Sequence, residues 1–207
     1  MPLTKINLSS GVTGNLNLAS NVTGTLPTSN YVQGGGLVRV GGGASESANT
    51  GNLAFDNVFT STYKTYLVVG WINKISDGSQ VLMRVKSSAG DKSNAGYKYG
   101  FNGVNNSGTN SDITGNGDTK FRLSGGSVSN DGHTSVNLSF WFYNPADSSK
   151  VTAINGFTTE TDESYVVTSR AGGGEHQVAE VHHGLMFTGN AQNIERYCIN
   201  IFGVKDS

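Results

Sequence analysis

The chain has almost nothing that could hold it together covalently. It contains a single cysteine, Cys198, so no disulfide can form within the chain. The stretch Tyr-Cys-Ile-Asn-Ile around Cys198 indicates a small buried hydrophobe rather than a reactive thiol. Stability must therefore come from packing or from assembly with other chains.

Charge and long apolar runs are also scarce. Charged residues make up 14 % of the chain, against about 25 % in an ordinary globular protein, and the net charge is −1. Without a basic surplus, the sequence does not predict nucleic-acid binding. No window approaches the ~18 apolar residues of a membrane span, and no signal-peptide run stands at the N-terminus. We expect no nucleic-acid partner, no membrane insertion, and synthesis in the cytoplasm.

The residue clusters that catalysis needs are missing as well. The densest acidic group, Glu160, Asp162 and Glu163, sits in a turn-like stretch and is typical of a solvated loop. Gly-x-Ser-x-Gly does not occur, and no Gly-rich loop precedes a helix that could bind phosphate. The sequence therefore predicts a protein that is not an enzyme and uses no cofactor.

What the chain does have is an internal repeat near its start. Residues 7–16 and 17–26 are identical at seven of ten positions. Each copy carries only three large apolar side chains, too few to offset the backbone ordering cost of ~1–2 kcal/mol per residue. The six side chains that we expect to anchor the repeat are Leu8, Val12, Leu16, Leu18, Val22 and Leu26.

This repeat predicts an extended arm. Pro27 closes the second copy, and a triple glycine at 34–36 forms a hinge. We expect residues 1–36 to order only against copies of the same chain, most simply as three chains, or against a partner surface. The alternative is a disordered tail rich in Gly, Ser and Thr.

Residues 37–207 read as a β domain. A short strand is expected at 37–40, a flexible Gly/Ser run at 41–52, and a strand at 63–75 with both faces largely apolar, as in a sandwich centre or a subunit interface. The strongest strand is 136–143. About nine or ten strands with turn signals between them, and no amphipathic helix, predict an antiparallel β-sandwich resembling a jelly roll.

Two weak candidate sites can be named. Aromatic and polar side chains that fit a glycan-binding site loosely are Tyr97, Tyr99, Asn102, Asn105, Asn106 and Asp112, with core or subunit packing as the alternative. A polar loop is expected from 102 to 118, and a triple glycine at 172–174 is expected to break the chain. For metal binding, none is expected beyond the weak candidate His182, through symmetry-related copies on a threefold axis. A buried, hydrogen-bonded histidine is the plainer interpretation.

Two segments resemble structural proteins of tailed bacteriophages. The run Val-Thr-Gly-Thr-Leu-Pro at 22–27 is similar to Thr-Gly-x-Leu-Pro repeats near the N-termini of phage fibre proteins. The run Phe-Asp-Asn-Val-Phe-Thr-Ser-Thr-Tyr-Lys-Thr-Tyr at 55–66 resembles a segment of virion proteins from phages of aquatic bacteria. Residues 87–135 match no such pattern.

The resemblance implies a homotrimer in the virion, made in the host cytoplasm. The arm would attach to tail, neck or capsid proteins, and the β domain would face outward, where it could meet host surface polysaccharide. Two repeats without a long shaft favour a short fibre over a long one. A capsid decoration or cement protein that staples capsomers is the alternative, and a longer polysaccharide-degrading tailspike fits least well.

Overall fold

The protein is described by a computed structural model that covers residues 36–74, 80–125, 135–162, 164–190 and 193–205. Contacts divide the chain between Gly34 and Gly35, two residues before the boundary expected from the sequence. The described residues contain strands and turns, with no helix that could span a membrane. The prediction of an all-β, antiparallel sandwich is therefore confirmed.

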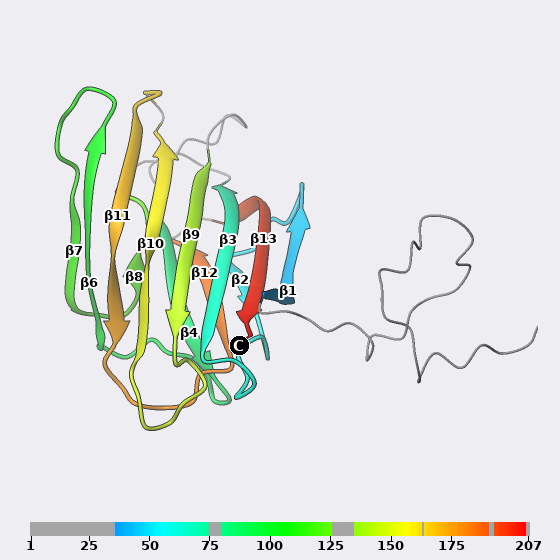
Figure 1. Cartoon of the computed structure of the whole chain (residues 1–207). Helices are drawn as coiled ribbons and strands as arrows, with labels where there is room; N and C mark the ends of the chain where they lie inside the picture. Colours follow the sequence, from blue (N-terminus) through cyan, green and yellow to red (C-terminus); the bar gives the residue numbers. More distant parts are fainter. Residues whose placement is uncertain (1–35, 75–79, 126–134, 163, 191–192, 206–207) are drawn as a thin grey trace, which may run out of the picture. The chain divides into compact units, whose positions relative to one another are not determined.

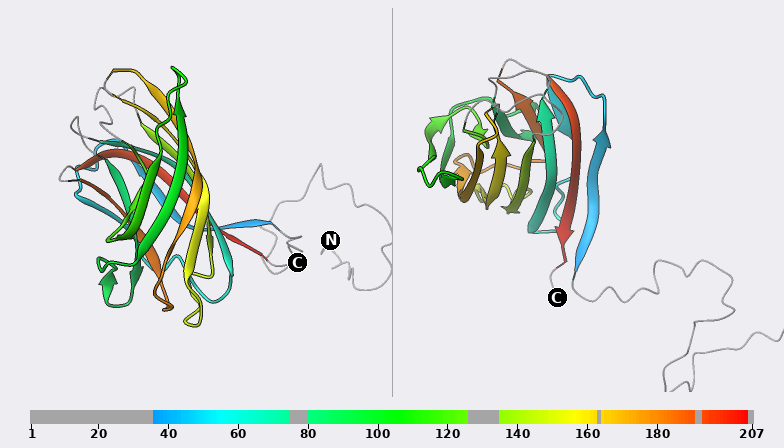
Figure 2. Two further views of the ribbon diagram at one scale, coloured as in Figure 1. Left: turned by 90° about the vertical axis from the view of Figure 1, so that its left-hand side faces the viewer. Right: turned by 90° about the horizontal axis from the view of Figure 1, so that it is seen from above.

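Two antiparallel sheets form the domain, and they lie face to face (Figures 1 and 2). The eight-stranded sheet, called sheet A, contains in spatial order β1 (Leu37–Ser45), β13 (Ile194–Val204), β3 (Thr65–Lys74), β9 (Val136–Tyr143), β10 (Thr152–Thr161), β11 (Val167–His176), β6 (Tyr97–Asn105) and β7 (Ile113–Asp118). The smaller sheet, sheet B, contains β2 (Asn52–Phe55), β12 (Gly184–Gly189), β4 (Val81–Ser87) and β5 (Gly90–Asp91), with β8 (Phe121–Arg122) also paired to β4.

Eight of these strands have the connectivity of a jelly roll. In sheet A the neighbours are β1, β13, β3 and β9, and in sheet B they are β2, β12, β4 and β8. Numbered along the chain, they follow the orders 1-8-3-6 and 2-7-4-5, which interleave the two sheets as a jelly roll does. The remaining strands are insertions: β5, β6 and β7 lie between β4 and β8, and β10 and β11 lie between β9 and β12.

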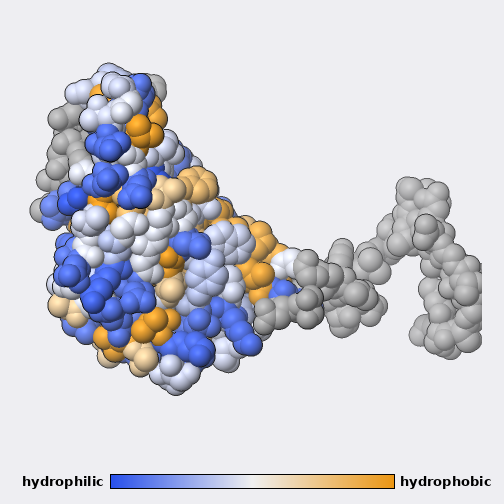
Figure 3. All heavy atoms as spheres, turned by 60° about the vertical axis from the view of Figure 1, so that its left-hand side comes forward, coloured by the Kyte–Doolittle hydropathy of each residue, from blue (hydrophilic) through white to orange (hydrophobic). Residues whose placement is uncertain are grey.

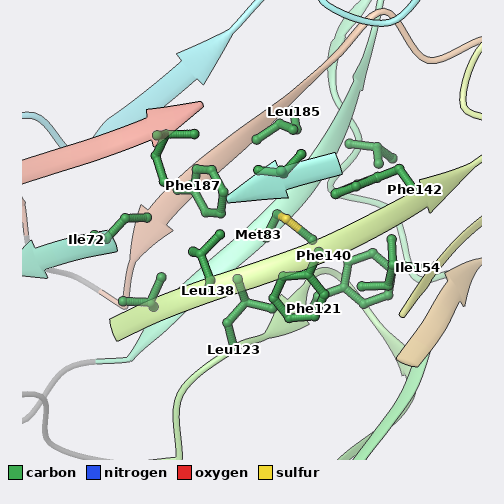
Figure 4. Packing of buried hydrophobic residues seen from close by; sticks show 14 of the residues in the cluster. Ile72, Met83, Phe121, Leu123, Leu138, Phe140, Phe142, Ile154, Leu185 and Phe187 are labelled. Atoms are coloured by element: carbon green, nitrogen blue, oxygen red, sulfur yellow. The ribbon is translucent and has the colours of Figure 1, made fainter. Parts of the chain in front are cut away.

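The core fills the space between the two sheets, and β9 shows which side chains enter it. Its even-numbered residues Leu138, Phe140 and Phe142 are buried, while Trp141 and Tyr143 lie on the opposite face of the strand. Phe142 packs on Phe59 with ring centroids 5.3 Å apart. Figure 4 shows the side chains of both sheets meeting in this layer.

Glycine runs continue strands where the sequence predicts breaks. β1 extends through Gly41–Gly43 to Ser45, so most of the expected flexible run is strand. β11 passes straight through Gly172–Gly174, which corrects the predicted break. Glycine occurs at this point of β11 because the neighbouring strand β6 lies very close. A Cβ on Gly172 would clash with the carbonyl oxygen of Gly100 on β6.

The expected polar loop at 102–118 is instead a hairpin. β6 continues to Asn105 and β7 begins at Ile113, which is 1 % exposed and belongs to the core. The turn between them is closed by Asn105, whose Oδ1 accepts from the backbone N–H of Ser107 and of Thr109 at 3.0 and 2.8 Å. This hairpin forms the free edge of sheet A and one wall of the groove described next.

Candidate functional site

An open groove of about 690 Å³ lies along the inserted strands of sheet A. We call it the sheet groove. It is lined by residues of β6, β10 and β11 and of the hairpin that leads into β7: Asn102, Gly103, Val104, Asn110, Asp112, Phe157, Thr158, Thr159, Ser169, Arg170 and Ala171. Strand alternation places side chains from three adjacent strands on this one side of the sheet.

The groove combines exposed apolar surface with neutral polar groups. Phe157 is 53 % exposed and Val104 is 49 % exposed. Around them stand the amides of Asn102 and Asn110 and the carboxylate of Asp112, whose Oδ1 accepts from the N–H of Gly103 at 2.9 Å. An aromatic face flanked by amides, hydroxyls and a carboxylate suits a sugar, which offers C–H surface on one side and hydroxyls at its rim.

A buried ion pair supports the groove from beneath. Arg170 is 3 % exposed, and its Nη1 lies 2.7 Å from Oε1 of Glu160. The same guanidinium donates from Nε to the carbonyl oxygen of Ser111 and from Nη2 to its Oγ, both at 2.7 Å. Glu160 also accepts from the N–H of Gly125. Arg170 thus fixes Ser111, which stands between the groove residues 110 and 112.

Few of the residues that line the groove carry charge. Among its lining residues only Asp112 and Arg170 carry charge, and Arg170 is fully engaged below the surface. Burial raises the pKa of Glu160, although Arg170 acts against this shift. Hydrolysis of a glycosidic bond needs two carboxyl groups that face the same bond, and the lining offers Asp112 alone.

The structure separates the predicted glycan residues into two groups. Asp112 lines the sheet groove, and Asn105 and Asn106 lie in the adjoining turn, where the N–H of Asn106 donates to the carbonyl oxygen of Val167 at 2.8 Å. Tyr97 and Tyr99 are 0 % and 7 % exposed and belong to the core, so they cannot contact a glycan. Core packing was the alternative for this pair, and it is the correct one.

Phe157 and Val104 were missed, whereas Asn102 was among the polar residues that the sequence offered for a glycan site. Phe157 carries a usable signal. Ile154 and Thr158 on the same strand face the core, so the aromatic side chain at 157, next to Thr158, must face outward. Val104 gives no such signal, because it reaches the groove only through the pairing of β6 with β11.

A second candidate surface is formed by the jelly-roll strands β13, β3 and β9 of sheet A, on the side that faces away from sheet B. We call this side of the three strands the outer face. Phe202, Leu67 and Trp141 stand in one row across these three strands, since Leu67 pairs with both of the others. Trp141 is 36 % exposed. Most neighbouring outward positions of the three strands are uncharged: Thr65, Val69, Trp71, Asn137, Ser139, Tyr143, Cys198, Asn200 and Val204. Two arginines border them: Arg196 on β13, and Arg39 on β1, which pairs with Phe202 and donates from Nε to Oδ1 of Asn200.

This outer face contrasts with the free edge of the sheet. Figure 3 brings the side of β6 and β7 forward, and hydrophilic residues cover most of that side with separate apolar patches between them. The exposed apolar residues Val104 and Phe157 belong to the groove, whereas Leu37 and Trp141 belong to the jelly-roll strands. Contiguous exposed apolar surface is typical of an interaction site.

The remaining predicted residues lie elsewhere. His182 is buried, and its Nδ1 is 2.7 Å from Oγ1 of Thr152. Its partners for a metal would be His176 and Glu180 of the same chain. The anchoring residues predicted in the arm, Leu8, Val12, Leu16, Leu18, Val22, Leu26 and Pro27, lie outside the described residues. None of the family models, curated proteins or solved structures compared with this chain matches it.

Proposed function

We propose that the chain is a non-enzymatic structural protein of a bacteriophage virion, a short homotrimeric fibre. Residues 1–36 attach it to tail, neck or capsid, and the jelly-roll domain faces outward. The observation that carries this proposal is the largely uncharged, partly apolar outer face of sheet A. The repeat arm and its resemblance to phage fibre proteins support the assignment to a virion.

The outer face suits a second and third copy of the same chain. A surface with few charges brings few like charges together when it packs on itself around a symmetry axis. The row of Phe202, Leu67 and Trp141 supplies two aromatic anchors and one aliphatic anchor at its centre, which is where interface energy concentrates. Both faces of β3 are then buried, as its apolar composition predicts.

Solution mass tests this assembly. We expect a particle of three times the chain mass of 21.7 kDa by light scattering. Leu67→Lys places a charge in the centre of the row and should give monomers that remain folded, because the side chain points away from the core. Ala54→Lys, at an exposed position on β2 of the other sheet, is the matched control and should stay trimeric. A monomeric wild-type protein would refute the trimer.

The arm is tested by truncation. Deleting residues 2–30 should leave a folded β domain, with unchanged circular dichroism, that no longer joins particles. Normal occupancy of the truncated protein on virions would rule out the anchor. The copy number per particle separates the fibre from a capsid decoration protein: a few dozen or fewer indicates a fibre, and hundreds indicate a decoration protein.

The sheet groove is the proposed contact with host surface polysaccharide. Its supporting features are exposed Phe157, the neighbouring amides and Asp112. Phe157→Ala and Asp112→Ala should each weaken binding to polysaccharide purified from host cells by about tenfold or more, since losing an aromatic stacking contact or a charged hydrogen bond costs about 1.5 kcal/mol or more. Val178→Ala, at another exposed apolar position outside the groove, is the control. Equal binding by all three variants would exclude the groove.

A further inference from the structure

A cluster of three side chains at one end of the sandwich has no role in the proposed function. His176 ends β11, and Glu180 and His182 lie in the segment that crosses from β11 in sheet A to β12 in sheet B. One ligand atom from each of these residues lies within 4.8 Å of the other two. Both histidines are 0 % exposed, so this is an interior cluster and not a chance gathering of surface groups.

Several buried polar atoms of the cluster have no hydrogen-bond partner among the residues that the structure describes. They are both ring nitrogens of His176, Nε2 of His182 and Oε1 of Glu180. A buried ring nitrogen or carboxylate oxygen without a partner is unfavourable, and native structures contain few of them. Because the three residues lie together, one shared ligand would satisfy an atom from each of them.

We propose that His176, Glu180 and His182 bind one divalent transition-metal ion, with Zn²⁺ as the best fit. Two imidazoles and one carboxylate form a common zinc ligand set, and water would complete a tetrahedron. With bonds of about 2.0–2.2 Å, two ligand atoms of such a site lie about 3.3–3.6 Å apart. Nε2 of His182 and Oε1 of Glu180 are 3.4 Å apart, and a ring nitrogen of His176 lies within 4.8 Å of both residues' ligand atoms.

The surroundings of His182 orient it for a metal. Oγ1 of Thr152 lies 2.7 Å from Nδ1, so Nδ1–H can donate to it and leave the lone pair of Nε2 directed at Glu180. Nε2 of His182 and Oε1 of Glu180 are then two acceptors that face each other, and a cation between them would remove their repulsion.

Glu180 is the solvent-facing member of the cluster. Its other oxygen, Oε2, is 2.6 Å from Nζ of Lys92, and both side chains are partly exposed. We expect the ion to reach the two buried rings past these two side chains.

Bound metal would fasten the crossover between the sheets. His176 belongs to a strand of sheet A, whereas His182 stands two residues before β12 of sheet B and bonds to Thr152 at the start of β10. One ion would tie these three elements together at the end of the sandwich. The role is structural, and it does not depend on the trimer or on polysaccharide binding.

The test is a titration of the full-length, untagged protein after removal of metal with EDTA. We expect one Zn²⁺ per chain in competition with a chromophoric chelator, and a visible Co²⁺ spectrum of tetrahedral intensity. Zn²⁺ in about 100-fold excess over its Kd should raise the melting temperature by about 5–10 °C. Thr152→Val should weaken binding by about tenfold through loss of the outer hydrogen bond.

Variants separate this site from other histidines. His176→Gln and Glu180→Gln should each abolish the 1:1 binding and the melting shift, with metal-free melting curves checking that both variants fold. His183→Ala, the adjacent half-buried histidine outside the cluster, should bind as the wild type does. Absence of saturable binding, or binding that survives both Gln variants or is lost in His183→Ala, overturns the site. The cluster would then be the other tautomer of His182, with Nε2–H donating to Glu180.

Discussion

Replacing Glu160 by leucine should destabilise the domain strongly, because it leaves Arg170 without its ion-pair partner. Arg170 would remain 3 % exposed with its charge uncompensated, because an arginine does not give up its proton inside a protein. Removing one partner of a buried ion pair costs about 3–5 kcal/mol. For a domain of this size the melting temperature should fall by about 10 °C.

Removing the other partner should behave differently. In Arg170→Met the carboxyl group of Glu160 is left alone, and it can take up a proton. Burial already raises the pKa of Glu160 in the wild type, and loss of Arg170 raises it further. A folded pKa above the unfolded value of about 4.3 contributes stability that is present below that value and is lost as pH rises through the folded pKa, by about 1.4 kcal/mol per pH unit.

Urea unfolding at pH 5 and pH 8, at one fixed protein concentration, measures both effects. Arg170→Met should lie closer to the wild type at pH 5 than at pH 8. Glu160→Leu lacks the carboxyl group whose raised pKa lowers wild-type stability as pH rises, so its loss relative to the wild type should be smaller at pH 8 than at pH 5. The double variant should regain much of the loss, because it buries no unpaired charge. Glu175→Gln, a partly exposed carboxylate on the same hairpin, should stay within about 0.5 kcal/mol. A loss below about 1 kcal/mol in Glu160→Leu, or equal pH dependence of the two variants, would refute the reasoning.

Three further predictions concern the scaffold. Phe140→Ala should cost about 3–5 kcal/mol in urea unfolding, because the side chain is fully buried between the sheets, and a cost below about 1 kcal/mol would contradict that placement. Gly172→Ala should destabilise the domain by about 1–3 kcal/mol, whereas Gly100→Ala should not, because only a Cβ at position 172 meets the backbone of the neighbouring strand. Equal effects of the two substitutions would contradict the close approach of the strands. Burial raises the pKa of Tyr97, so above about pH 10 this tyrosine ionises only in the unfolded chain and the free energy of unfolding should fall. Tyr97→Phe should flatten that fall, and an unchanged slope would show that Tyr97 is not the cause.

The jelly-roll strands could be predicted from the sequence, whereas the insertions could not. Strand β3 was recognised by its length and by the apolar residues on both of its faces. Strand β9 alternates with period two, and the burial of Phe140 and Phe142 follows directly. The same rule should have assigned Tyr97 and Tyr99 to the core, since they alternate with Lys98 and Gly100 on one strand. Their polar neighbours in sequence suggested a surface site, but period-two alternation is the stronger signal.

Glycine-rich strands and long-range polar pairs are harder for a physical reason. Gly172 has no side chain to show which face it occupies, and its need for close strand approach is visible only when β6 lies beside β11. Glu160 and Arg170 stand ten residues apart on paired strands, and their partner Ser111 is 59 residues from Arg170. Periodicity reports which way a side chain points, but it does not report which strand lies next to it.

The inserted hairpin of β10 and β11 explains why both candidate ligand sites occur where they do. The jelly-roll strands β3, β9 and β13 bury mainly apolar side chains, but the inward positions of this hairpin bury polar ones: Thr152, Thr158, Glu160, Thr168, Arg170 and His176. Buried polar groups need fixed partners, so each end of the hairpin acquires a defined constellation. At one end Arg170 supports the sheet groove, and at the other His176 joins the proposed metal site. An apolar hairpin of the same length would pack against the core equally well and would hold neither. The insertion is therefore where we expect function to be concentrated, with the jelly roll as its scaffold and as the surface for assembly.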